Sequence, residues 1–313
     1  MAKVTIVGAG QTGAATAQFL AEKQLADLVL IDVLEGMAQG KALDLRQALP
    51  VMGADLRVVG STEYAETTGS DIIVVTAGLP RKPGMSREEL LLANSTIVRS
   101  AVEHTLPLSP DAIYIILTNP LDAMAYLAMK CGELPRERVI GQAGVLDSAR
   151  MRAFVAEELA VSVQNVHCYV LGGHGDDMLP LTRHSNVAGV PLAELLPSDR
   201  LQAIVDRTRN GGAEIVGLLR TGSAFFAPGA ALAQMVEAIL LNRHLILPAS
   251  AYLQGEFGQS GIFFGVPVQL GREGVERIIE YKLDAHEAAA LHQSAERVRE
   301  TIASLGEIVP LRH

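Results

Sequence analysis

The sequence has few cysteines and no long apolar run. Its 313 residues include only Cys131 and Cys168, which lie in separate segments and show no metal-ligand spacing. This excludes a disulfide framework, predicts no metal site and favours a reducing compartment. The apolar run near the start stops at Gly8, too soon for the core of a signal peptide, and no stretch reaches the length of a membrane span. We therefore expect a soluble, cytoplasmic protein with no membrane partner.

Positive charge is also scarce. The formal net charge is −9, from 26 Lys and Arg against 35 Asp and Glu. Because nucleic acids and anionic membranes are bound through basic surfaces, this balance excludes both as partners. Hydrophobic residues make up 49% of the chain and charged residues 19%, which is enough for a large core and argues against disorder.

The first half alternates short apolar runs with helical segments. The runs are rich in Val and Ile, as expected for strands buried on both faces of a parallel sheet, and cover residues 4–7, 28–31, 56–59, 72–75 and 112–117. Helix-forming segments lie between most of them, at residues 12–23, 38–49 and 87–103. This alternation predicts an α/β fold with a doubly wound parallel sheet of the Rossmann type.

The pattern changes near Gly144, where the helical segments become longer. They cover residues 146–159, 199–210, 230–241 and 287–305, with shorter extended segments at 166–171 and 262–270. Ser198 and Asp284 are expected N-caps, and Gly211-Gly212 is expected to end the second of these helices. We predict two domains that pack tightly, a Rossmann domain over residues 1–143 and a mixed α+β domain over residues 144–313.

Residues 79–87, Leu-Pro-Arg-Lys-Pro-Gly-Met-Ser-Arg, follow an expected buried strand. Two prolines and a glycine forbid regular structure, and Ser86 with Glu89 forms a capping box that starts a helix at Arg87. The segment is predicted to be a stiff cationic flap, with Arg81 on it, beside a sheet edge where a small anion binds. A solvated surface loop is the alternative.

A glycine pattern indicates a dinucleotide site. A strand leads into Gly8-Ala-Gly10-Gln-Thr-Gly13, and an alanine-rich helix follows. Gly8 permits the tight turn, Gly10 lets the backbone approach a pyrophosphate, and Gly13 lets helix and strand pack closely. Asp32 ends the next strand, where its carboxylate can bind the adenine ribose and would repel a 2′-phosphate. The pattern favours NAD over NADP, with FAD or a simple glycine turn as alternatives.

Asn119 follows the strand expected at residues 112–117, in Thr118-Asn119-Pro120. Its place at the carboxyl edge of the sheet would let its amide bond the nicotinamide ribose or a substrate oxygen. Asn-Pro is also an ordinary turn pair, which is the alternative interpretation.

His174 is flanked by glycine on both sides, in Leu-Gly-Gly-His-Gly-Asp. Glycine is costly in ordered structure, so this setting indicates either a close approach by a ligand or a demanding turn. Histidine is the side chain best suited to exchange a proton near neutral pH. Asp147 and Arg150 share a helix face and either form a simple ion pair, or separate, with Asp147 holding His174 and Arg150 gripping a carboxylate bidentately.

Taken together, these motifs resemble the lactate/malate dehydrogenase family, and within it the lactate dehydrogenase-like malate dehydrogenases of bacteria. The matching segments occur in family order over essentially the whole chain. They are Gly8 to Gly13, Asp32, and residues 80–87, 118–120, 146–150, 172–176 and 221–226.

The resemblance implies a role for each matched catalytic residue. His174 is the proton donor and acceptor and is paired with Asp147. Arg150 binds the C1 carboxylate of the substrate, and Arg87 polarises the carbonyl that is reduced. Asn119 contacts substrate and cofactor.

The resemblance also implies a substrate and an assembly. Arg81 stands where lactate enzymes carry Gln, and an arginine there meets a second carboxylate. The implied activity is the reversible NAD-dependent oxidation of (S)-malate to oxaloacetate in the tricarboxylic acid cycle, and Asn94 is assigned with Asn119 to the cofactor. Family members form dimers or tetramers, and we favour a homotetramer. The alternatives are a dehydrogenase of another 2-hydroxy acid such as lactate, and a non-catalytic NAD-sensing protein.

Overall fold

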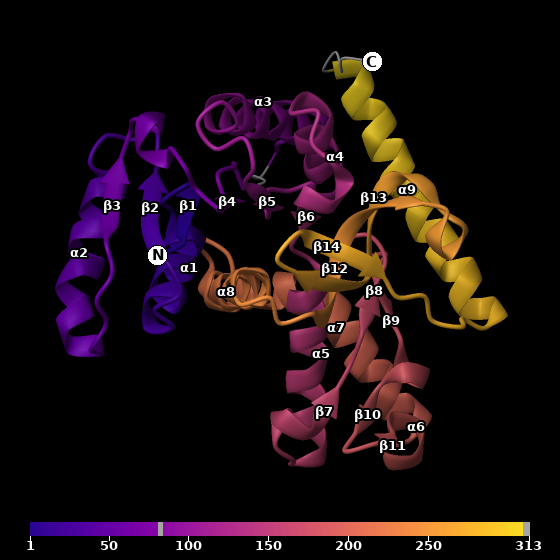
Figure 1. The fold of residues 1–313 in the computed structure, drawn as a ribbon. Coiled ribbons are helices and arrows are strands. Elements are labelled where there is room, and N and C mark those ends of the chain that lie inside the picture. Colours follow the sequence, from indigo (N-terminus) through magenta and orange to yellow (C-terminus); the bar gives the residue numbers. More distant parts are fainter. Residues whose placement is uncertain (81–83, 309–313) are drawn as a thin grey trace.

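The computed structural model describes residues 1–80 and 84–308. Within these residues a nine-stranded sheet has the order β14-β13-β12-β6-β5-β4-β1-β2-β3 (Figure 1). Its parallel strands are β1 (Lys3–Val7), β2 (Asp27–Ile31), β3 (Val58–Ser61), β4 (Ile72–Val75), β5 (Ile113–Ile116) and β6 (Val139–Gly141). Their order in space, 3-2-1-4-5-6, is that of a doubly wound parallel sheet of the Rossmann type. The predicted fold class is therefore confirmed.

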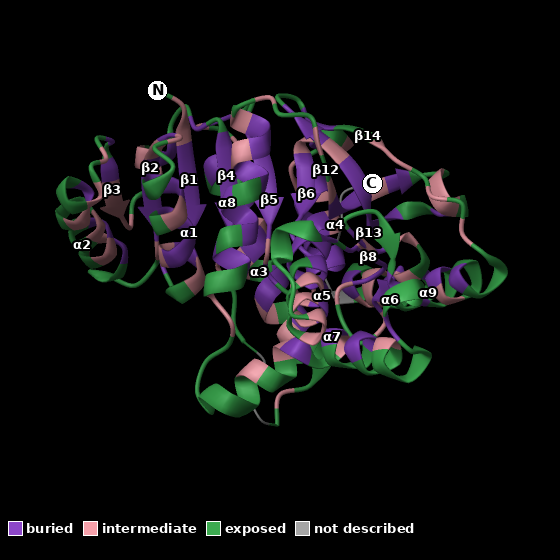
Figure 2. Cartoon of the chain, turned by 90° about the horizontal axis from the view of Figure 1, so that it is seen from below, coloured by how far each residue is buried: buried purple, intermediate pink, exposed green. Residues whose placement is uncertain are grey.

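Helices cover both faces of the parallel strands. The helices of the first half are α1 (Gln11–Glu22), α2 (Met37–Met52), α3 (Arg87–Thr105) and α4 (Leu121–Cys131). Alternate residues of β4 point to opposite cores: Ile72 and Val74 join the cluster that contains α1, and Ile73 and Val75 join the one that contains α3 and α4. Strands buried on both faces explain the continuous Val- and Ile-rich runs, and Figure 2 shows them as a buried layer between partly exposed helices.

The second half extends the same sheet. Ser250 of β12 pairs antiparallel with Gly141 of β6, so the two halves share backbone hydrogen bonding. The long elements are α5 (Gly144–Leu159), α7 (Ser198–Leu219), α8 (Phe226–Leu240), β12 (Leu245–Gln254), β13 (Ser260–Gly271), β14 (Gly274–Ile278) and α9 (Ala285–Ile308). The short elements are β7 (Val166–His167), β8 (Val170–Leu171), β9 (Leu179–Pro180), β10 (Asn186–Val187), β11 (Val190–Pro191) and α6 (Leu192–Leu195).

Some predicted helix ends are confirmed and others are wrong. Ser86 and Glu89 form the predicted capping box, and the Glu287 amide donates to Asp284 Oδ1 at 2.8 Å, which confirms that N-cap. Ser198 is not an N-cap, because α7 begins at this residue and Pro197 precedes it. Gly211-Gly212 does not end α7, which continues to Leu219. Each glycine costs a helix interior only about 1 kcal/mol, which tertiary packing of a long helix readily exceeds.

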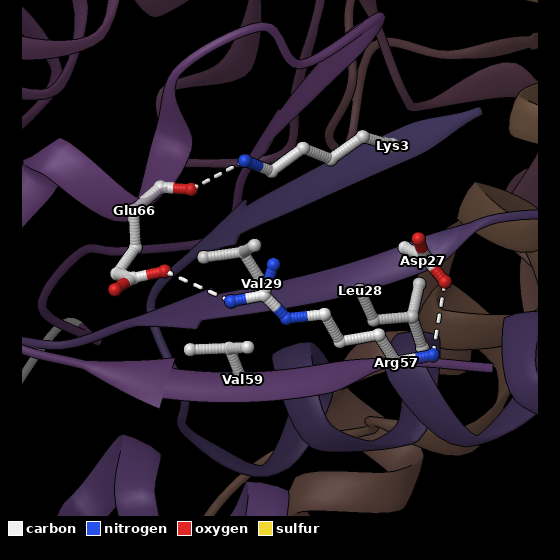
Figure 3. A pocket seen from close by; sticks show the side chains of 7 residues that line it. All are labelled: Lys3, Asp27, Leu28, Val29, Arg57, Val59 and Glu66. Carbon is white, nitrogen blue, oxygen red and sulfur yellow. Dashed lines mark hydrogen bonds and ion pairs between the residues drawn. The ribbon is translucent and has the colours of Figure 1, made fainter. Parts of the chain in front are cut away.

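A small charged pocket lies at the amino edge of the sheet, away from the carboxyl edge described below (Figure 3). The Lys3 ammonium donates to the Glu66 carbonyl at 2.6 Å, and the Arg57 amide donates to Asp27 Oδ1 at 2.9 Å. Burial and the nearby Arg57 charge lower the pKa of Lys3. Two acidic and two basic side chains line this pocket, so their charges balance. Their hydrogen bonds connect the starts of neighbouring strands.

No helix within residues 1–80 and 84–308 combines the length and the apolar character needed to cross a membrane.

Candidate active site

The turn after β1 has the geometry that the glycine pattern predicts. Gly8 has φ +106°, and a Cβ there would lie 2.5 Å from the Ala77 nitrogen. A Cβ on Gly13 would collide with the Gly8 carbonyl oxygen, so this glycine permits the close packing of α1 on β1. A Cβ on Gly10, in contrast, would meet no atom within 4 Å among the described residues. Gly10 therefore faces open space, as expected where a backbone lines a ligand site.

Two groups around this open space fit a dinucleotide. Gly10 is the N-cap of α1 and supplies no side-chain cap, so the positive end of the helix dipole is available to phosphates. Asp32 lies at the end of β2, where Oδ2 accepts from the Ala9 amide at 2.8 Å and Oδ1 from the Leu34 amide at 3.0 Å. Each oxygen keeps a lone pair that can accept a ribose hydroxyl.

Asn94 forms hydrogen bonds to Leu79, which follows β4, and to Asn119, which follows β5. Its side chain is 1% exposed. Its Oδ1 accepts from the Leu79 amide at 2.8 Å, and its Nδ2 donates to the Asn119 carbonyl at 2.6 Å. Asn119 itself is exposed at the carboxyl edge of the sheet. The structure therefore gives Asn94 a bracing position, and direct contact of Asn94 with the cofactor stays a prediction.

Gln142 is a polar residue that the sequence analysis missed. It follows β6 and is 0% exposed. Its backbone amide donates to the Ile116 carbonyl at 2.8 Å. Neither polar atom of its side chain has a hydrogen-bond partner in the part of the chain that the structure describes. Because buried polar groups are almost always paired, this side chain is suited to meet a polar ligand at the carboxyl edge. A lone Gln after a strand carries no sequence signal for such a role.

Asp147 joins His174 to Arg150. His174 Nδ1 lies 2.9 Å from Asp147 Oδ2, and Arg150 Nη1 donates to Asp147 Oδ1 at 3.0 Å. The side chains are 18%, 2% and 13% exposed for His174, Asp147 and Arg150. The structure therefore shows both the ion pair and the contact of Asp147 with His174, since one carboxylate binds the histidine with one oxygen and the arginine with the other. Binding of a substrate carboxylate by Arg150 stays a prediction. Nε2 of His174 is the ring nitrogen left for a substrate.

The protonation of His174 is set by opposing effects. Burial acts to lower its pKa, whereas the Asp147 charge and the hydrogen bond to Asp147 raise it. The net result is a raised pKa, so the histidine keeps its proton at a higher pH than usual.

The backbone around His174 is held by residues far away in the sequence. The His174 amide donates to Asp122 Oδ2 at 3.2 Å, and Ser250 Oγ donates to Asp122 Oδ1 at 2.6 Å. The Gly173 amide donates to Ser294 Oγ at 3.0 Å. Burial is the main reason that the pKa of Asp122 is raised. The glycine-rich turn is thus braced by α4, β12 and α9, and sequence reasoning did not find these residues.

Of the two other predicted arginines, the structure describes Arg87. Arg87 begins α3, as predicted, and is exposed. Between it and the three residues joined through Asp147, no hydrogen bond or ion pair occurs in residues 1–80 and 84–308. Arg81 lies outside the described residues.

A cavity of about 120 Å³ lies beside His174, between α4 and α9, and Asp122 and Arg297 are among its lining residues.

Comparison with known proteins places the chain in a family. Residues 2–141 match the model for the lactate/malate dehydrogenase NAD binding domain, and residues 144–308 match that for the lactate/malate dehydrogenase alpha/beta C-terminal domain. The chain therefore belongs to the lactate/malate dehydrogenase family, as the motifs predicted, and the predicted NAD cofactor is confirmed. It is 56% identical over 306 residues to a malate dehydrogenase of Thermomicrobium roseum, which covers 98% of this chain and 99% of that relative.

Solved structures agree with this assignment. The malate dehydrogenase of Picrophilus torridus in its apo form superposes with a TM-score of 0.96 at 45% identity, and the match covers 98% of each chain. A lactate dehydrogenase of Cryptosporidium parvum complexed with lactic acid and cofactor gives a TM-score of 0.94 at 39% identity, covering 97% of this chain and 98% of that one. The fold alone thus does not separate the two activities.

Proposed function

We propose that the chain is an NAD-dependent malate dehydrogenase that catalyses the reversible reaction (S)-malate + NAD⁺ = oxaloacetate + NADH + H⁺. The observation that carries this proposal is the joining of His174 and Arg150 through Asp147. A proton-exchanging ring and a carboxylate-binding guanidinium are thereby held side by side, in a chain with an NAD binding domain. The similarity to named malate dehydrogenases supports the choice of substrate.

Each group of the site has a task in this reaction. The cofactor supplies the hydride to oxaloacetate and takes it back from malate. Arg150 holds the C1 carboxylate with the planar geometry that suits bidentate binding, and Arg87 polarises the carbonyl. His174 gives its Nε2 proton to the new alkoxide oxygen during reduction and removes it during oxidation. Asp147 stabilises the charged form of the ring.

The remaining predicted residues hold the cofactor. We infer that Gly8, Gly10 and Gly13 form the pyrophosphate turn, that Asp32 binds the adenine ribose, and that Asn119 contacts the nicotinamide side. Asn94 acts with Asn119, to whose carbonyl it donates. On this proposal residues 1–143 bind NAD and residues 144–313 carry most of the substrate site.

A substrate panel tests the proposal. NADH oxidation is measured with oxaloacetate, pyruvate and 2-oxoisocaproate under identical conditions. We expect the highest kcat/KM with oxaloacetate. A preference for pyruvate would establish the lactate alternative, and NADH binding without turnover of any 2-oxo acid would establish the sensor alternative.

Arg81 is proposed to select the substrate. Replacing it with glutamine removes a charge-assisted hydrogen bond to the second carboxylate, worth about 1.5–3 kcal/mol. The ratio of kcat/KM for oxaloacetate to that for pyruvate should fall by roughly ten- to a hundredfold. The same ratio in the variant and the unmodified enzyme would show that another residue makes the choice.

The raised pKa of His174 predicts opposite pH profiles for the two directions. Oxaloacetate reduction needs the protonated ring, so its kcat/KM should be full at low pH and fall as the pH rises through the raised pKa. Malate oxidation needs the neutral ring and should rise over the same interval. Both midpoints should lie above about 6.5, the ordinary value for histidine. Midpoints below that value in initial-rate profiles would contradict the assignment.

We also infer that the enzyme is a cytoplasmic homotetramer of the tricarboxylic acid cycle. Support for assembly comes from exposed apolar side chains near the junction of α7 and α8, where Leu218 is 78% exposed and Phe226 is 64% exposed. Apolar side chains that are exposed next to one another are typical of subunit contacts.

A further inference from the structure

Two adjacent glycines occupy the middle of α7, where helices normally avoid them. Gly211 and Gly212 lie more than a turn from either end of a 22-residue helix. Each costs about 1 kcal/mol relative to alanine in this position. Gly211 is buried, so the cost is not explained by a solvent-exposed hinge. Some feature of the folded structure must require the absence of a side chain.

The atoms next to the missing side chains belong to Arg150. A Cβ built on Gly211 would lie 3.1 Å from Arg150 Cδ and 3.5 Å from Arg150 Nε. A Cβ built on Gly212 would lie 3.6 Å from Arg150 Nη2. The bare backbone of α7 therefore forms a wall along the length of the arginine side chain.

Arg150 is confined from the other side as well. Its Nη1 donates to Asp147 Oδ1 at 3.0 Å, and α5 carries both residues. Its Nε is buried and has no hydrogen-bond partner among residues 1–80 and 84–308. The guanidinium is thus held between the Asp147 carboxylate and the helix, so a shift of the stem moves the whole planar group.

We propose that Gly211 and Gly212 are positioning residues that form a seat for Arg150. The seat keeps the stem of the arginine close to α7 and so sets where its guanidinium meets the substrate carboxylate. This inference rests on the proposed function, in which Arg150 binds that carboxylate. The glycine pair in this helix is on this view a requirement of substrate binding, kept at the expense of helix stability.

The seat predicts different outcomes for three glycines of the same helix. At Gly211 an added methyl group is too close to Arg150 for an ordinary contact, so the arginine must shift by a few tenths of an ångström. At Gly212 the contact of 3.6 Å is ordinary. Gly217 is exposed, and a Cβ there would meet nothing within 4 Å in the described structure. It is the matched control, because Gly217→Ala changes helix propensity without adding a contact to Arg150.

The test compares Gly211→Ala, Gly212→Ala and Gly217→Ala. For Gly211→Ala we expect the KM for oxaloacetate to rise about tenfold, since small displacements of positioning groups are costly, with little change in kcat or in the Kd for NADH. Gly212→Ala should show a smaller rise, and Gly217→Ala should raise Tm without a kinetic effect. If the KM of Gly211→Ala were within twofold of that of the unmodified enzyme, the proposal that these glycines position Arg150 would be overturned.

A second measurement is independent of catalysis. Gly211→Ala is also made in an Arg150→Ala background, where the methyl group no longer meets the arginine. There it should raise Tm as Gly217→Ala does, whereas with Arg150 present the gain should be smaller or reversed. Additive Tm changes would overturn the seat even if Gly211→Ala alone proved too unstable for kinetics. An unmodified enzyme that failed to reduce oxaloacetate would instead overturn the proposed function.

Discussion

His174→Asn should lower kcat for oxaloacetate reduction by about 10²–10⁴-fold, the usual contribution of a positioned acid–base group. Asparagine can keep a polar contact with Asp147, which lies 2.9 Å from the ring nitrogen, but it cannot give up a proton at neutral pH. NADH binding should be unaffected, because no hydrogen bond joins His174 to the turn from Gly8 to Gly13 in the described chain. Steady-state rates and NADH fluorescence titration measure the two effects separately.

The control for this variant is His292→Asn. His292 lies on α9, and its side chain is 65% exposed. It should retain normal kcat, KM and NADH affinity. Turnover of His174→Asn within tenfold of the unmodified enzyme would remove His174 from the mechanism.

The second large effect is expected from Asp147→Asn, because this carboxylate serves two partners. With its charge gone, the pKa of His174 should fall, since Asp147 is the main group that raises it. The amide can also donate to the ring nitrogen and favour the wrong tautomer. Arg150 would lose its ion pair as well. We expect kcat to fall at least a hundredfold and KM for oxaloacetate to rise.

Asp147→Asn should also move the pH profile and the stability. The midpoint of oxaloacetate reduction should shift to lower pH, in line with the loss of the raising charge. Removing one partner of a buried ion pair typically costs about 3–5 kcal/mol, and we expect the lower end because Arg150 is 13% exposed. Glu158→Gln, at an exposed ion pair on the same helix, is the control and should change neither kinetics nor the pH midpoint. An unshifted midpoint in Asp147→Asn would contradict the pairing.

Local chemistry explains what the sequence could predict. The strand–turn–helix context of Gly8 to Gly13 defines a backbone path within a few residues, and the capping box at Ser86 is equally local. His174 and Asp147 are 27 positions apart, yet residue type and the family resemblance were enough to pair them. Motifs of this kind depend on chemistry that few residue types can perform.

Contacts without a motif could not be predicted. Asp122 and Ser250 are 128 positions apart, and neither residue type is unusual in its local setting. Gln142 is notable only because its buried side chain lacks a partner in the described structure, which requires coordinates to see. The predicted end of α7 was wrong for a related reason. A glycine pair usually marks the end of a helix, but here the space beside the two glycines is filled by the Arg150 side chain.

The pairing of Gly141 with Ser250 has a consequence for motion and for folding. Two domains joined only by a linker can swing about it, but a continuous sheet across the boundary opposes such a hinge. Access to the site should therefore depend on local segments rather than on a swing of one half against the other. Either half made alone would expose β6 or β12 as a bare strand edge, which invites self-association. We therefore expect the two halves to unfold together.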